Sequence, residues 1–322
     1  FLNLKSNNDY PIKINLIRSK TDMTKDLISK EELKPFMQRS DFNALVITAW
    51  IWLSIVFCFA LAALYSNWLM YGLVVCLLAG RQQALAALMH EAGHNTFFKT
   101  KKYNEFVTNW VSAPFLLMDG KTYSRWHLEH HKNAGTKDDP DLANYQHYPV
   151  TKMSLIRKFA RDVFGVTGVK LIAYLALSGK DSLTRQKRAP FTITKGLVFN
   201  GALFLILWSV GQAHLFSLWF IAHFTVYMFI IRYRQIAEHA GVKDLFDLDP
   251  KYNTRSVPQG LLGFLFFSPT QGLSYHCEHH AFMAVPSYNL KAVHKLLIDK
   301  GYYEDIRLAK GYLDIFPEII KS

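Results

Sequence analysis

The chain has 322 residues, half of them hydrophobic, and a formal net charge of +12. This combination is unusual for a soluble enzyme, and nucleic acid is not an expected partner because no recognised nucleic-acid-binding motif accompanies the charge. The three cysteines include no Cys-x-x-Cys pair, which argues against a disulfide framework, a zinc ribbon or an iron–sulfur cluster.

The distribution of charge predicts membrane helices. None of the 37 Lys and Arg residues lies in 44–80 or 196–231. A transmembrane helix needs about 20 apolar residues, whereas helices buried in a soluble core usually offer about 10–14, so a soluble helical bundle is the weaker alternative. We predict two helical hairpins, with crossings at residues 44–65, 68–89, 196–210 (starting near 191) and 214–231.

The basic residues also predict the topology. Both hairpin tips lack Lys and Arg, and by the positive-inside rule the remaining segments face the cytoplasm. The prediction is an all-α integral membrane protein, in an inner membrane if bacterial and in the endoplasmic reticulum if eukaryotic. Its single domain, 1–322, divides into an N-terminal segment 1–43, a first hairpin 44–89, a cytoplasmic insertion 90–190, a second hairpin 191–232 and a cytoplasmic tail 233–322.

The first histidine-rich stretch, H-E-A-G-H, follows the second crossing. If this helix continues without a break, His90 and His94 stand at i and i+4 on one face, just above the bilayer. The stretch also fits the H-E-x-x-H pattern of zinc metalloproteases, with Glu91 as general base. A protease, however, would leave the histidines farther along the chain unused, and a metal transporter would be expected to place polar ligands within the membrane.

Two further stretches, H-L-E-H-H and H-C-E-H-H, repeat the pattern. They contribute His127, His130, His131, His276, His279 and His280. Eight histidines exceed the needs of one tetrahedral zinc, whereas two six-coordinate ions could use eight or nine. The fourth crossing would carry a ninth ligand, His239, with Gln235 one turn earlier on the same face.

Metal-bound histidines usually donate their second ring N–H to a carboxylate or carbonyl. Several acidic residues near the stretches could accept these hydrogen bonds, although a helix cap or a solvated carboxylate is as plausible for each. The candidates are Glu91, Glu129, Asp138, Asp139, Asp141, Glu238 and Glu278.

The three boxes, His-x3-His, His-x2-His-His and His-x2-His-His, resemble those of the membrane fatty acid desaturase and hydroxylase superfamily, from about residue 81 to 297. The run 275–280, followed by Val285 and Pro286, looks most like bacterial acyl desaturases. This resemblance implies a non-haem diiron centre, O2 as oxidant and an aliphatic substrate. His239 matches an extra histidine ligand of the family, and Gln235 matches an Asn that some members place near one metal.

The expected reaction is O2-dependent desaturation of a lipid's fatty acyl chain by hydrogen abstraction. Hydroxylation of a lipid, alkane or carotenoid remains open, because the two outcomes diverge only after the first hydrogen is lost. Zinc has no redox chemistry and cannot drive either reaction. Since the sequence contains no electron carrier, we predict a separate donor, such as a ferredoxin, a rubredoxin or a small cytochrome, on the basic cytoplasmic face.

Overall fold

The computed structural model describes residues 27–177, 191–270 and 272–321, which form helices joined by loops. The α-helices are α2 (Lys30–Leu33), α3 (Asp41–Leu64), α4 (Trp68–Gly93), α5 (Lys101–Phe106), α6 (Gly120–Asn133), α7 (Lys152–Val163), α8 (Val166–Leu177), α9 (Thr192–Ser209), α10 (Phe216–Phe224), α11 (Val226–His239), α12 (Pro250–Asn253), α13 (Leu261–Phe266), α14 (His276–Ala281), α15 (Leu290–Asp299) and α16 (Phe316–Ile319). A π-helix (Val107–Ser112) and short 3-10 turns complete the described structure. The all-α prediction is confirmed.

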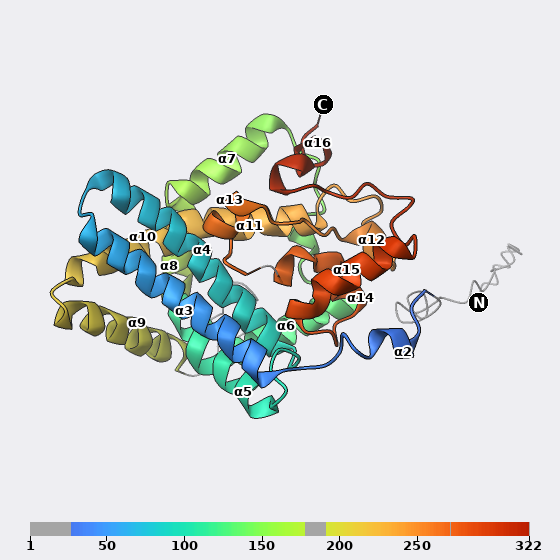
Figure 1. Ribbon diagram of the computed structural model, residues 1–322. Helices are drawn as coiled ribbons and strands as arrows, with labels where there is room; N and C mark the ends of the chain where they lie inside the picture. The colour runs from blue at the N-terminus through green and yellow to red at the C-terminus, as the bar shows by residue number, and fades with distance from the viewer. Residues whose placement is uncertain (1–26, 178–190, 271, 322) are drawn as a thin grey trace, which may run out of the picture.

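Four helical segments are long and apolar enough to cross a bilayer: Asp41–Leu64, Trp68–Gly93, Thr192–Ser209 and Ala213–His239. The loop between α3 and α4 is short, and Asn67 caps α4 by accepting a hydrogen bond from the Met70 N–H at 3.0 Å. Both hairpin turns lie at one end of the molecule, and the C-terminal helices α12, α14 and α15 lie at the other (Figure 1). The four-helix, two-hairpin prediction is thus confirmed, which indicates an integral membrane protein.

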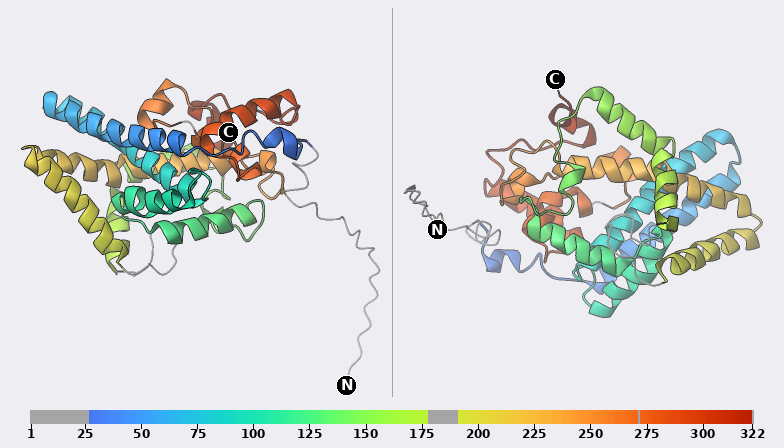
Figure 2. Two further views of the ribbon diagram at one scale, coloured as in Figure 1. Left: turned by 60° about the horizontal axis from the view of Figure 1, so that its bottom comes forward. Right: turned by 180° about the vertical axis from the view of Figure 1, so that it is seen from behind.

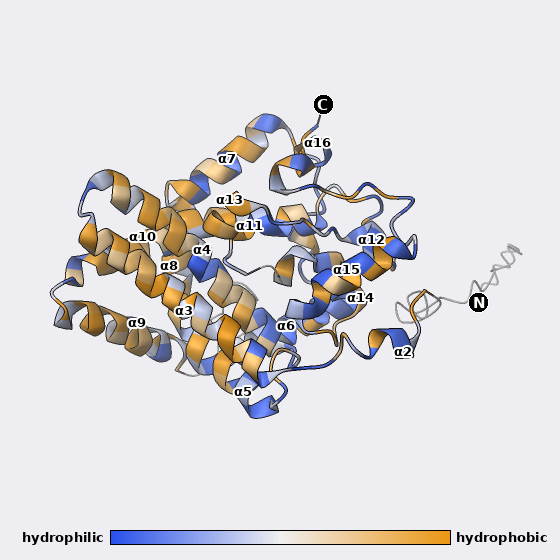
Figure 3. Cartoon of the chain, viewed as in Figure 1, coloured by the Kyte–Doolittle hydropathy of each residue, from blue (hydrophilic) through white to orange (hydrophobic). Residues whose placement is uncertain are grey.

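The outer faces of the hairpins are apolar although they are exposed. Val56 and Phe57 on α3, and Leu205 and Ile206 on α9, are each more than half exposed. Apolar residues dominate α3, α9 and α10, whereas polar residues gather around α2, α12 and α15 (Figure 3). An apolar surface of this extent suits contact with lipid, because soluble monomers rarely expose such a patch.

The fourth crossing differs from the continuous helix that the sequence predicts. Thr225, with φ −123° and ψ −92°, separates α10 from α11. Helix α8 packs closely on this break, since a Cβ at Gly168 would lie only 2.6 Å from the Cβ of Phe224. Beyond the break, α11 continues toward the C-terminal helices (Figure 2).

The polar interruption of the second crossing is buried between helices. Arg81 is only 6% exposed and donates a hydrogen bond to the carbonyl of Leu265, near the end of α13. The side chain of Gln82 donates to the carbonyl of Trp219 in α10 at 2.9 Å. A cation suits the unsatisfied carbonyls at a helix C-terminus. These polar residues therefore join α4 to α13 and α10 just before α4 reaches its histidines.

A buried ion pair fixes α7 against α11, and removing it should destabilise the fold. Asp162 is fully buried and accepts two hydrogen bonds from Arg232, one of them at 3.0 Å. We expect Asp162→Ala to cost about 2 kcal/mol, below the roughly 3–5 kcal/mol of a fully buried pair, since the Arg232 side chain is 32% exposed. The midpoint of thermal unfolding in detergent should fall by a few degrees.

The matched control for this prediction is Glu105→Ala. Glu105 pairs with Lys101 at 4.0 Å, and both side chains are more than half exposed. Exposed pairs contribute little to stability. Equal unfolding midpoints for the two variants would contradict the structural role of Asp162.

Candidate metal centre

Four helices bring the predicted histidines together. Helix α4 carries the first box at its C-terminal end, and α6 carries the second box behind an N-cap in which Asp119 accepts from the Thr122 N–H at 2.7 Å. Helix α11 ends at His239, and the third box forms the short helix α14. Of the nine histidines, eight are buried and His94 is half-buried.

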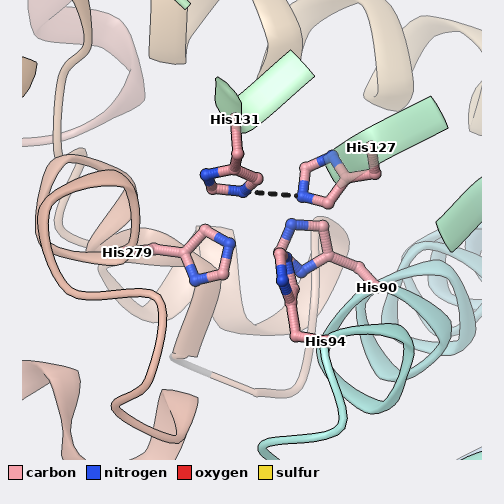
Figure 4. A group of neighbouring side chains, drawn as sticks. All are labelled: His90, His94, His127, His131 and His279. Atoms are coloured by element: carbon pink, nitrogen blue, oxygen red, sulfur yellow. Dashed lines mark hydrogen bonds between the residues drawn. The ribbon is translucent and has the colours of Figure 1, made fainter. Parts of the chain in front are cut away.

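The nine side chains form two groups. The five-histidine group contains His90, His94, His127, His131 and His279, and the four-histidine group contains His130, His239, His276 and His280. Within each group, one ring nitrogen per residue lies within 4.8 Å of all the others. The five rings of the first group come from three separate helices and point toward one another (Figure 4).

The second and third boxes each divide their histidines between the groups. In α6 the i, i+4 pair His127 and His131 joins the five-histidine group, while His130 joins the other. In α14 the i, i+4 pair His276 and His280 joins the four-histidine group, while His279 crosses to the first. Each helix thus links both groups, which are adjacent: the rings of His131 and His280 stack with centroids 4.1 Å apart.

Ring nitrogens within each group face one another at short range. The Nε2 atoms of His131 and His127 are 2.8 Å apart, as are those of His276 and His239. In the described part of the chain, the Nε2 atom of His90 is buried without a hydrogen-bond partner. Two nitrogens that each lie about 2.1 Å from one cation would be roughly 3 Å apart. The donor set therefore fits one metal ion in each group.

Burial keeps the imidazoles neutral. It lowers the pKa of His94 to about 4, and together with the neighbouring imidazoles it holds the pKa of His131 and His279 well below the ordinary value of 6.5. Metal ligation requires the neutral ring. At neutral pH these side chains are therefore already in the form that binds a metal.

Carboxylates contact the second ring nitrogen of several histidines. Glu91 lies 2.9 Å from His90 Nδ1, and Asp139 lies 2.8 Å from His130 Nδ1. Burial alone would raise the pKa of Asp139, but hydrogen bonds from His130 and Tyr145 outweigh it and lower that pKa. These charged acceptors fix the orientation of the rings.

Two longer contacts complete the set of carboxylates. Glu238 lies 3.7 Å from His276 Nδ1, and Asp141 lies 3.9 Å from His130 Nδ1. Both distances exceed hydrogen-bond length. The closer partners are Arg234, which donates to Glu238 at 2.6 Å, and Trp126, which donates to Asp141 at 3.3 Å.

A comparison of the chain with protein families matches residues 66–311 to the family described as fatty acid desaturase. The chain belongs to this family. The matched region contains all nine histidines.

Curated relatives of this desaturase-family enzyme are distant. A putative sphingolipid delta(4)-desaturase/C4-monooxygenase of Caenorhabditis elegans is 25% identical over 74% of the chain and 60% of its own length. An sn-1 acyl-lipid omega-3 desaturase (ferredoxin) of Synechocystis is 24% identical over 72% of the chain and 68% of its own length. A Bos taurus sphingolipid delta(4)-desaturase/C4-monooxygenase is 23% identical over 93% of the chain and 87% of its own length. The chain thus spans less than two thirds of the worm protein.

Three of the predicted carboxylates lie away from the rings of the two histidine groups. Glu129 and Asp138 are exposed, and Glu278 is fully buried but accepts from Ser256 and Tyr303 and lies 2.6 Å from His294 Nδ1. Glu129 and Glu278 lie away from the rings because of their positions around their helices. Each stands two residues from both members of an i, i+4 histidine pair, about 200° around the helix from each. The spacing in the sequence alone therefore indicates that these two glutamates point away from the paired histidines.

Gln235 is half-buried on α11, one turn before His239. Its predicted place beside a metal stays a prediction.

Sequence reasoning missed two residues that support the candidate metal centre. The Tyr145 ring stacks on His239 with centroids 4.8 Å apart, and its hydroxyl donates to Asp139, so it supports two members of the four-histidine group. Arg255 donates to the carbonyl of Ala237 at 2.8 Å and thereby holds the end of α11. Neither belongs to a spacing pattern, because both stand in segments without helical periodicity.

Lowered histidine pKa values predict an acid-sensitive apoprotein. Between pH 6.5 and about 4 the unfolded chain binds protons that a folded histidine such as His94 does not. Stability therefore falls as the pH falls through this window, and above it these groups contribute nothing because both states are neutral. Thermal unfolding of the metal-free protein across this range is the measurement. A midpoint that does not fall would contradict the burial of neutral imidazoles.

Proposed function

We propose that the enzyme is an O2-dependent diiron desaturase that acts on a fatty acyl chain of a membrane lipid. The five-histidine group would hold one iron and the four-histidine group the other. The observation that carries this proposal is the division of nine histidines, eight of them buried, into two adjacent groups, each with converging ring nitrogens. We further propose that the chain works as a single domain with its metal site on the cytoplasmic side, as the basic segments suggest.

The arrangement of Glu91 argues against a zinc metalloprotease. A protease of the H-E-x-x-H type uses this glutamate as a general base at the metal-bound water. Here a Glu91 oxygen lies 2.9 Å from His90 Nδ1, where it supports the ligand ring instead. Zinc would also leave the second group without a role, and it cannot accept electrons.

When bound in the two groups, two irons would supply the redox chemistry that activates O2. Desaturation would remove two protons and two electrons, that is two hydrogen atoms, from the acyl chain. A donor would supply two further electrons and solvent two further protons, so that O2 is reduced to two waters. The nine histidines would hold the irons as neutral ligands. Glu91 and Asp139 accept from Nδ1 of His90 and His130 and keep the Nε2 atoms directed inward. Burial of the rings limits the access of water.

An apolar cavity of about 320 Å³ supports an aliphatic substrate. It is lined by Val46 and Trp50, which are half-exposed on the lipid-facing side of α3, and by Leu88 and Glu91 on α4. A hydrocarbon chain from the bilayer would thus pass next to the first histidine box. Apolar lining with a few polar groups is typical of such ligand sites.

Hydroxylation is the second candidate, because two relatives carry the name desaturase/C4-monooxygenase. The same relatives and the Synechocystis acyl-lipid desaturase support a sphingolipid or a glycerolipid acyl chain as the substrate. We propose an external electron donor of the ferredoxin type, which the name of the Synechocystis protein includes.

Lipid mass spectrometry tests the proposal. Cells that express the intact chain should accumulate lipids with one additional double bond, and cells that express His130→Ala should not. An added oxygen would favour the hydroxylase instead. An unchanged lipid profile in protein shown to hold iron and to receive electrons would overturn both candidates.

A further inference from the structure

The outward face of α6 carries a cationic patch, formed by Lys121, Arg125, Leu128, Glu129 and Lys132. Its three cations are exposed, and Leu128 is 46% exposed among them. In the described part of the chain these cations make no ion pair. The carboxylate of Glu129, the one acid of the patch, turns toward Asn133 at 3.5 Å. Three cations against one acid leave the patch positive.

The patch lies directly behind the metal ligands. The opposite face of the same helix presents His127, His130 and His131 to the two groups. An α-helix with its side chains is about 10–12 Å thick, so one helix separates the patch from the site. Helix α6 lies on the outside of the molecule, seen in green in the right-hand view of Figure 2.

A cavity beside the patch leads toward the half-buried ligand. Its volume is about 500 Å³, and it is lined by Lys121, Arg125 and Leu128 of the patch, by the acidic Glu105 and Asp119, and by Gly93 and Asn95. The last two residues flank His94, the one site histidine that is not fully buried. The patch therefore adjoins the most open approach to the five-histidine group.

We infer that the cationic patch of α6 is the docking surface for an acidic [2Fe–2S] ferredoxin. This inference rests on the proposed function, which requires an external electron donor. Charges around an apolar centre are typical of protein docking sites, and a patch of this size suits a small, transient redox encounter. Complementary charge would steer an acidic donor to the helix that holds three of the ligands. Each ferredoxin gives up one electron, so two successive dockings supply the two electrons of one turnover.

The test compares two triple charge reversals in the purified full-length enzyme, held in nanodiscs of neutral phosphatidylcholine. The first variant is K121E/R125E/K132E. The matched control, K152E/R157E/R161E, changes net charge equally at exposed cations of α7. The substrate-saturated rate is measured against the concentration of a plant-type ferredoxin that its NADPH-dependent reductase keeps reduced. Iron content and reduction by dithionite, which needs no docking surface, check that each variant retains its site.

At about 10 mM salt, where the Debye length is roughly 30 Å, the α6 variant should lose at least about tenfold in kcat/KM for ferredoxin. The α7 variant should keep the wild-type value. At about 1 M salt the difference between wild type and the α6 variant should shrink, because charges are then screened within roughly 3 Å.

Several results would overturn the docking site. These are an unchanged kcat/KM in the α6 variant, an equal loss in both variants, or a loss of dithionite reduction along with ferredoxin-driven turnover. Altered binding to vesicles of anionic phosphatidylglycerol with unaltered ferredoxin kinetics would assign the patch to lipid and overturn it too. A wild-type enzyme that contains no iron would overturn the proposed diiron function. Iron content therefore distinguishes a failure of the proposed function from a failure of the docking site alone.

Discussion

Replacing His239 with alanine should reduce product formation below detection and lower bound iron from about two ions per chain to about one. His239 is buried at the end of α11, with its Nε2 atom 2.8 Å from that of His276. Without it, three histidines remain in the four-histidine group. An ion with one nitrogen ligand fewer and an additional water binds more weakly, whereas the five-histidine group keeps its complete set.

The measurements are metal analysis of the purified variant and mass spectrometry of the lipids. His147→Ala is the matched control, since His147 is exposed and belongs to neither group. It should retain iron and activity. A His239→Ala enzyme with two irons and full turnover would remove His239 from the ligand set. One zinc per wild-type chain would favour the protease alternative.

The membrane helices were predictable because a bilayer imposes a simple requirement on composition. Residues 44–65 contain no Lys or Arg, and α3 (Asp41–Leu64) occupies almost the same range. The break at Thr225 could not be predicted in this way. Helix α8 packs against it at Gly168, a contact between segments that local hydropathy does not record.

The convergence of the histidines was predictable from spacing, but their division into two groups was not. Positions i and i+4 share a helix face, which correctly joins His127 with His131. Whether the intermediate His130 completes the same group depends on where α11 and α14 approach α6. Local sequence contains no information on that approach. Tyr145 was missed for the same reason, because its stacking on His239 joins a loop to a distant helix.

Two glutamates that look equivalent in the sequence should behave differently when each is replaced by glutamine. Glu91 stands three residues before His94, about 60° around the helix from it, and it is buried 2.9 Å from His90 Nδ1. Glu129 stands on the far side of α6 and is exposed. We expect Glu91→Gln to weaken iron binding by about 10–100-fold, as is typical for the loss of a carboxylate that orients a ligand ring.

Competition with an iron chelator, measured on both purified variants, provides the comparison. Glu129→Gln should bind iron as the wild type does, since its side chain contacts Asn133 rather than a ligand. Its unfolding midpoint should also match the wild type, whereas a folding defect in Glu91→Gln would appear there as well as in iron binding. Because Glu91 also lies 3.9 Å from His279 Nδ1, its loss should affect two ligands from different helices of the five-histidine group. Equal iron affinity in the two variants would show that charge behind the rings does not hold the metal, and that convergence of the imidazoles alone is sufficient.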